Sequence, residues 1–203
     1  MIGVHMSTAS ILVAIILAAL QATDQKERTN RQAVYRAVLQ DARCKGSGRP
    51  EFKGDRPVLL REVVNPIEQA WWQYAPAPGL AERLPKMIPG LRAELLQEYV
   101  RINAPRSLFT EDEARQLGAD LVSRPELDEM GKTAWIWTAF YQRFPSASAL
   151  VELSAPAIDR AAGEALVYCG ESTAALAGRG FLILLRNGST GWTPVFWQQM
   201  WIS

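Results

Sequence analysis

The sequence predicts an α+β fold in which a helical N-terminal half packs on a C-terminal antiparallel β-sheet, a meander. Apolar residues at helical spacing, with helix-capping signals, characterise the first part of the 203-residue chain. Short apolar runs separated by turn residues characterise its last third. The length suits one core, so we expect residues 23–203 to form a single α+β domain.

The first 22 residues are interpreted as a signal peptide. The apolar run from Ile11 to Leu20 has the length of a secretory h-region and is shorter than the roughly 20 residues that span a bilayer. Cleavage after Ala22 would place the mature chain outside the cytoplasm, in the periplasm or the medium, with no transmembrane span. A buried or interfacial helix and an uncleaved short anchor are the alternatives.

Removal of this segment would take away His5, the chain's only histidine. Histidine is the usual general base near neutral pH, the usual partner of a Ser or Cys nucleophile and a common metal ligand. We therefore predict no catalytic residue, no metal site and no cofactor. The 22 basic and 21 acidic residues nearly cancel and form no basic stripe, so nucleic acid is not an expected partner.

Two cysteines, Cys44 and Cys169, lie far apart in the sequence. In an oxidising compartment they could form a disulfide, which in the chain-entropy model would stabilise the fold by on the order of 4 kcal/mol. The alternative is two free, buried thiols.

The elements of the helical part are predicted from the spacing of its apolar residues and from the positions of its glycines and prolines. We expect an amphipathic helix at 24–42, a glycine- and proline-rich loop at 44–57, a strand at 58–66, an irregular connection or short helical turns at 67–89, and an amphipathic helix at 91–105.

Two capping boxes follow. Thr110 with Glu113, and Ser123 with Glu126, are spaced to cap short helices that Gly118 and Gly131 would terminate. The carboxylates in these segments are interpreted as first-turn helix residues rather than as a catalytic pair or a cation site. A further helix is expected at 132–145.

Four strands are predicted in the last third, at 149–154, 164–169, 180–186 and 192–203. Gly178 and Gly180 precede a strand rather than a helix, which disfavours a phosphate-binding turn and indicates a bulge, a bend or a close approach of another backbone. Asn187 and Gly188 predict a hairpin turn. The same residues begin an Asn-Gly-Ser sequon, which would matter only in an exported eukaryotic protein.

Aromatic residues and one arginine are the candidate ligand-binding residues. The last strand is apolar on both faces, so we expect it to be central and its tryptophans to be core residues. Trp71 and Trp72 are adjacent in a proline-broken segment, so one of them could line a groove. Arg179, between two glycines, could bind an anion, and the alternative is a solvated turn residue.

The C-terminal third resembles a group of uncharacterised bacterial exported proteins. The shared features are a Trp and a Phe before an aromatic-Pro pair, a strand that ends in Ser, Ala-Leu-Val-Tyr, Gly-x-Gly, Gly-x-Trp and a terminal Trp-x-Ser; here they are Trp137, Phe140, Phe144-Pro145, Ser154, Ala165 to Tyr168, Gly178, Gly180, Trp192 and Trp201 to Ser203. The helix sequence LQEYVRINAP also resembles the group's Asn-bearing helix. The resemblance implies an exported bacterial protein with a C-terminal antiparallel sheet, and it implies no activity.

Three functional hypotheses follow. The first is a non-catalytic binding or interaction domain that recognises a protein or a small ligand. The second is a hydrolase or transferase that uses carboxylates such as Glu152 or Glu164, without histidine. The third is a partner that neutralises a toxin. Two carboxylates converging in a pocket would favour the enzyme, and an exposed apolar or aromatic patch would favour the binding domain.

Overall fold

The computed structural model describes residues 8–41, 43–44, 54–63, 79–104, 108–133 and 135–203. The described helices are α1 (Thr8–Gln40), α2 (Leu80–Met87), α3 (Ala93–Asn103), α4 (Glu111–Gln116), α5 (Arg124–Thr133) and α6 (Ile136–Arg143). The described strands are β1 (Arg56–Leu60), β2 (Asp120–Val122), β3 (Ala147–Leu153), β4 (Ala157–Asp159), β5 (Glu164–Ala174), β6 (Ala177–Gly188) and β7 (Gly191–Ile202).

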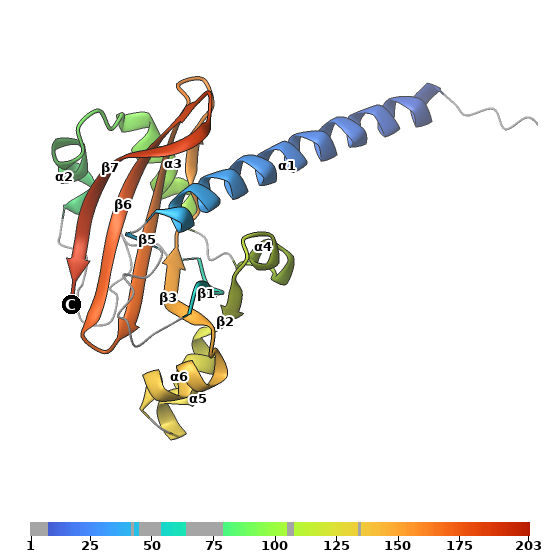
Figure 1. The fold of residues 1–203 in the computed structure, drawn as a ribbon. Coiled ribbons are helices and arrows are strands. Elements are labelled where there is room, and N and C mark those ends of the chain that lie inside the picture. Colours follow the sequence, from blue (N-terminus) through green and yellow to red (C-terminus); the bar gives the residue numbers. More distant parts are fainter. Residues whose placement is uncertain (1–7, 42, 45–53, 64–78, 105–107, 134) are drawn as a thin grey trace, which may run out of the picture.

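The strands form one mixed sheet in the order β2-β1-β3-β5-β6-β7, with β4 paired to β5 (Figure 1). Strands β5, β6 and β7 make the predicted antiparallel meander, and β3 joins it antiparallel to β5. Strand β1 is parallel to both β2 and β3, because helices separate these three strands in the sequence and bring the chain back in the same direction. The α+β fold class is thus confirmed, with a largely antiparallel sheet.

Both faces of the sheet are covered by helices, so the apolar runs in β3, β5 and β6 are buried on both sides. One face packs its leucines, among them Leu150, Leu166 and Leu182, against residues of α2, α3 and α6. The other face packs Val151, Val167 and Ile183 in a second cluster with residues from the end of α1 and from α4. This two-sided burial explains why the middle strands read as continuous apolar sequence instead of an alternating pattern.

Helix α1 is continuous from Thr8 to Gln40 and includes Ala22, where the signal peptide was predicted to end. Among its described side chains, those of the last turns pack on the sheet, through Val34, Tyr35, Val38 and Leu39. Residues 17–29 are exposed, and Figure 1 shows this part of the helix pointing away from the rest of the fold. Among the described residues, none of the helices combines the length and hydropathy that crossing a membrane requires.

The prediction that the last strand is central is wrong, because β7 lies at the edge of the sheet and pairs with β6. Its aromatic side chains are half-buried: Phe196 packs against the core on one face, and Trp192 and Trp197 pack against the core on the other. Both faces of β7 are therefore apolar because helix-covered cores lie on both sides of the sheet, even at its edge.

The hairpin between β6 and β7 is confirmed, but its turn lies two residues later than predicted. Asn187 pairs with Trp192 and Gly188 pairs with Gly191, so Ser189 and Thr190 form the loop. The positive φ that the turn requires, +99°, falls on Gly191.

The two glycines proposed as helix terminators differ. Gly118 follows α4 with a φ of +69°, as expected of a residue that ends a helix. Gly131 does not end its helix, since α5 continues to Thr133.

Candidate functional site

A cleft of about 380 Å³ opens beside the parallel strands β1 and β2. Its lining comprises Arg56, Arg61, Glu111, Asp120, Leu121, Glu126, Arg143, Phe144, Pro145 and Ser146. The volume lies in the range of small-ligand sites, which is about 300–1,000 Å³. Three guanidinium groups and three carboxylates line it, so its formal charges cancel.

Two of the three arginines in the cleft are paired. The Arg61 guanidinium forms an ion pair with Glu111, and the Arg56 Nη2 atom lies 3.3 Å from the Asp120 Oδ1 atom. These pairs are partly exposed, so each contributes little to stability but fixes where the charges sit.

Arg143 and Glu126 are the remaining charged groups of the cleft. The Arg143 guanidinium lies 5.3 Å from the centre of the Phe144 ring, and it makes no ion pair with the part of the chain that the structure describes. Glu126 accepts hydrogen bonds from the Ser123 hydroxyl at 2.6 Å and the Ser123 amide at 2.8 Å, both on Oε2. These bonds, helped by the charges of Arg61 and Arg143, hold the pKa of Glu126 below its ordinary range. The cleft thus presents one cation and one anionic oxygen to a ligand.

The predicted capping boxes account for part of this geometry. Ser123 and Glu126 bond reciprocally at the start of α5, and Thr110 and Glu113 do the same at the start of α4. Burial opposes ionisation of Glu113, but the bonds from Thr110 and the charge of Arg31 outweigh it and lower the pKa of this carboxyl. Both capping predictions are confirmed, and the arginines of the cleft were missed because they come from distant strands and helices.

Glu152, one of the two carboxylates of the enzyme hypothesis, is buried in β3. Desolvation raises its pKa to about 7, although the Arg124 guanidinium, whose Nη2 atom is 3.9 Å from the Glu152 Oε1 atom, opposes this. A methyl group on Gly170 would lie 3.2 Å from the Glu152 Oε2 atom and 2.6 Å from the Tyr168 Oη atom. The carboxyl and the phenol therefore crowd over this glycine.

Glu164, the other carboxylate of that hypothesis, is ion-paired at the opposite end of β5. Its Oε2 atom lies 3.0 Å from the Arg92 Nε atom, and its Oε1 atom lies 3.4 Å from the Arg186 Nε atom. Glu152 pairs with Gly170, six positions along β5 from Glu164, which at roughly 3.3 Å per residue separates the two by about 20 Å. Pairs of catalytic carboxylates lie about 5–10 Å apart, so these two do not form one.

Arg179, the candidate anion-binding residue, is a strand residue rather than a turn residue. It lies in β6, its guanidinium is 3.4 Å from the Glu171 carboxylate, and it is 5.8 Å from the centre of the Phe181 ring. The other predicted ligand-binding residues, Trp71 and Trp72, lie outside the described residues, as does His5.

Cys44 and Cys169 are both buried in the core beneath α1 and carry free thiols in this structure. Burial first, and then the neighbouring Cys44 thiol, raise the pKa of the Cys169 thiol well above its ordinary value. Among the described residues, no group of three or more His, Cys, Asp or Glu side chains is placed to hold a metal ion.

Comparisons of this chain with protein-family models, with curated proteins and with solved structures find no match. The fold and the site define an α+β domain with a polar, ion-paired cleft at the parallel end of its sheet.

Proposed function

We propose that this protein is an exported bacterial binding domain that catalyses no reaction and that holds a ligand in the cleft between β1, β2 and α6. Export is supported by the apolar run at Ile11–Leu20 and by the resemblance of the C-terminal third to bacterial exported proteins. Binding is supported by the composition of the cleft, whose arginines and carboxylates are arranged in pairs.

The observation that carries the proposal is the Arg143–Glu126 arrangement. A ligand with charges of both signs can place an anionic group on Arg143 and a cationic group on the Oε1 atom of Glu126. The remaining ion pairs, Arg61–Glu111 and Arg56–Asp120, would flank it without a change of partner. The chemistry that fits is an amino-acid-like small molecule or a peptide terminus.

A titration followed by nuclear magnetic resonance tests this proposal. The probe is triglycine with free termini, and the matched control is N-acetyl-triglycine amide, which has the same backbone but neither charge. We expect saturable shifts of the amides at Glu126, Arg143 and Ser146 with the free peptide alone. Equal shifts with both peptides, or none with either, would refute the ligand class. Because the charged groups are partly exposed, the affinity should be millimolar.

The second candidate function, a carboxylate-dependent hydrolase or transferase, is favoured by one observation, the raised pKa of Glu152. An acid with a pKa near 7 can donate a proton at neutral pH. Turnover of chromogenic esters or glycosides that is lost in Glu152→Gln would support this function over binding. A third hypothesis, toxin neutralisation, differs from general binding in the identity of the partner, and a toxin-like reading frame beside the gene would favour it.

A further inference from the structure

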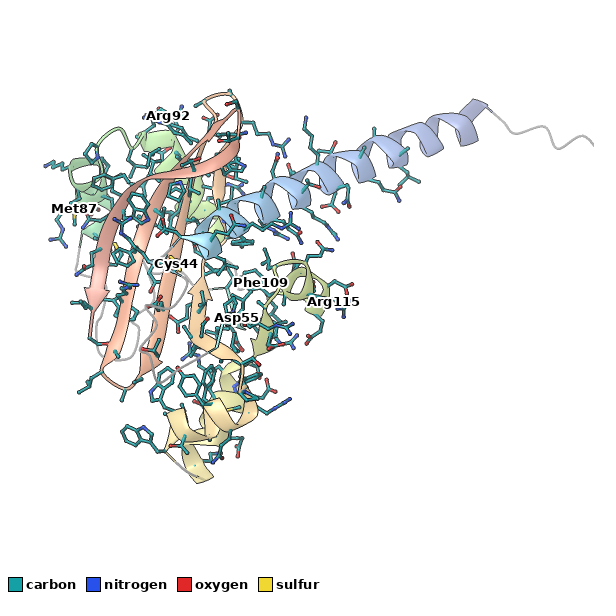
Figure 2. The ribbon with its side chains drawn as sticks, in the orientation of Figure 1. Cys44, Asp55, Met87, Arg92, Phe109 and Arg115 are labelled. Atoms are coloured by element: carbon teal, nitrogen blue, oxygen red, sulfur yellow. The ribbon has the colours of Figure 1, made fainter. Side chains whose placement is uncertain are left out.

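Cys44 and Cys169 come from distant parts of the chain and meet in one apolar cluster. Cys44 follows the end of α1, and its backbone amide donates to the Asp41 carbonyl at 3.0 Å. Cys169 lies in β5, in the interior of the sheet, opposite Phe181 of β6. Figure 2 labels Cys44 where α1 meets the sheet.

The two thiols share one apolar environment. Both side chains are completely buried, and the apolar side chains around them include Val38, Val167 and Ile183. Cys44 and Cys169 belong to the same buried cluster, and the Cys44 thiol is a neighbour of the Cys169 thiol. A disulfide between them would bring their Cβ atoms to about 3.5–4.5 Å from each other.

We propose that Cys44 and Cys169 form an intramolecular disulfide that links the end of α1 to strand β5. The described buried contacts of α1 with the sheet are made by its last turns, around Val34 and Val38. The bond would keep the projecting helix attached to the domain when those contacts open. This inference depends neither on the ligand of the cleft nor on export, because the oxidant can be supplied in solution.

The reaction is an ordinary thiol–disulfide exchange. The thiolate of one cysteine attacks a small-molecule or protein disulfide, forms a mixed disulfide and releases one thiolate. The thiolate of the second cysteine then attacks the sulfur atom of the first cysteine in the mixed disulfide and displaces the second thiolate. The two cysteines lose two electrons and two protons in total, the oxidant gains the electrons, and its two sulfur atoms leave as thiols.

The order of folding and oxidation follows from burial. Desolvation raises the pKa of the Cys169 thiol well above its ordinary value, and the neighbouring Cys44 thiol and the carboxylates of Glu171 and Asp41 raise it further. In the folded, reduced protein Cys169 therefore holds little thiolate at neutral pH. Oxidation should be fast while the chain folds and slow once β5 and α1 have packed.

Refolding of the denatured, reduced full-length chain with and without glutathione disulfide tests the proposal. We expect the oxidised product to lose two hydrogen atoms in mass, to resist alkylation when denatured, and to yield one peptide that joins Cys44 to Cys169. Reduction should lower the melting temperature by roughly 10 °C. Reduced protein that is already folded should oxidise much more slowly than protein that is refolding.

Single variants supply the controls. Cys44→Ala and Cys169→Ala should each keep one thiol that glutathione can cap, and neither should gain stability from the oxidant. If a variant fails to fold, the mass and peptide map of the natural chain still decide. Two alkylatable thiols after oxidative refolding, or a disulfide between two chains, would overturn the proposal.

Discussion

The indole of Trp201 donates a hydrogen bond from Nε1 to the hydroxyl oxygen of Tyr168 at 2.7 Å, across the intervening strand β6. The ring can lie there because Gly178 and Gly180 have no side chain: a methyl group on Gly180 would lie 2.1 Å from Trp201 Nε1. The glycine pair therefore makes room for an aromatic side chain, with a bulge after Gly180.

Gly180→Ala should accordingly destabilise the protein by about 1–3 kcal/mol, because the new methyl group displaces the Trp201 indole and breaks its bond to Tyr168. Urea unfolding measures the loss. The matched control is Gly188→Ala in the same strand, where a methyl group would meet no atom within 4 Å. An equal loss of stability in both variants would contradict the explanation that Gly180 makes room for the Trp201 ring.

Glu152→Gln should change stability in a pH-dependent way. The folded-state pKa of Glu152, about 7, is raised above its ordinary value of 4.5. The folded state therefore holds a proton that the unfolded state releases, and the stability from this group is complete below pH 4.5 and is lost as the pH rises through 7. Glutamine does not ionise, so the variant keeps its stability as the pH rises. At pH 8.5 it should be more stable than the natural protein by roughly 3 kcal/mol.

The comparison at low pH is the internal control for that substitution. At pH 4.5 the natural carboxyl is neutral in the folded protein, so Glu152→Gln should be nearly neutral there, with Arg124 and Tyr168 facing either side chain. Urea unfolding from pH 4.5 to 8.5 gives the curve. A difference between the two proteins that stays constant across this range would show that desolvation does not govern Glu152.

Asn103→Ala should cost about 2 kcal/mol. The Asn103 side chain accepts from the Ala155 amide at 2.8 Å and donates to the Tyr99 and Ala155 carbonyls, each at 2.9 Å, so it joins α3 to the segment after β3. Its removal leaves buried backbone groups without partners. Gln97→Ala, at an exposed position of the same helix, is the control and should change the free energy of unfolding by less than about 0.5 kcal/mol.

Local signals in the sequence predicted much of the fold. The capping residues Thr110 and Ser123 and the apolar runs around Val167 and Ile183 act within a few residues, so their helices and strands could be placed. Strand order is a long-range property. The edge position of β7 and the three-residue strands β2 and β4 depend on pairing with distant segments, which periodicity does not report.

The candidate site was harder to predict for the same reason. Arg143 lies in α6, Glu126 lies in α5 and Arg61 follows β1, and no spacing in the sequence connects them. Arg179 was selected from the sequence because glycines flank it. In the structure these glycines leave space for the Trp201 ring, and the arginine forms an ion pair with Glu171. That Cys44 and Cys169 share one buried cluster likewise became visible only in the structure, where the segment after α1 enters the core.

The affinity of triglycine for the natural protein, for Arg143→Ala and for Arg115→Ala tests the central claim most directly. Arg115 is an exposed arginine on α4 that pairs with Asp112 outside the cleft (Figure 2). If the cleft holds a ligand through Arg143, saturable binding should disappear in Arg143→Ala and stay unchanged in Arg115→Ala. Undiminished binding in Arg143→Ala, or the same loss in both variants, would contradict the account.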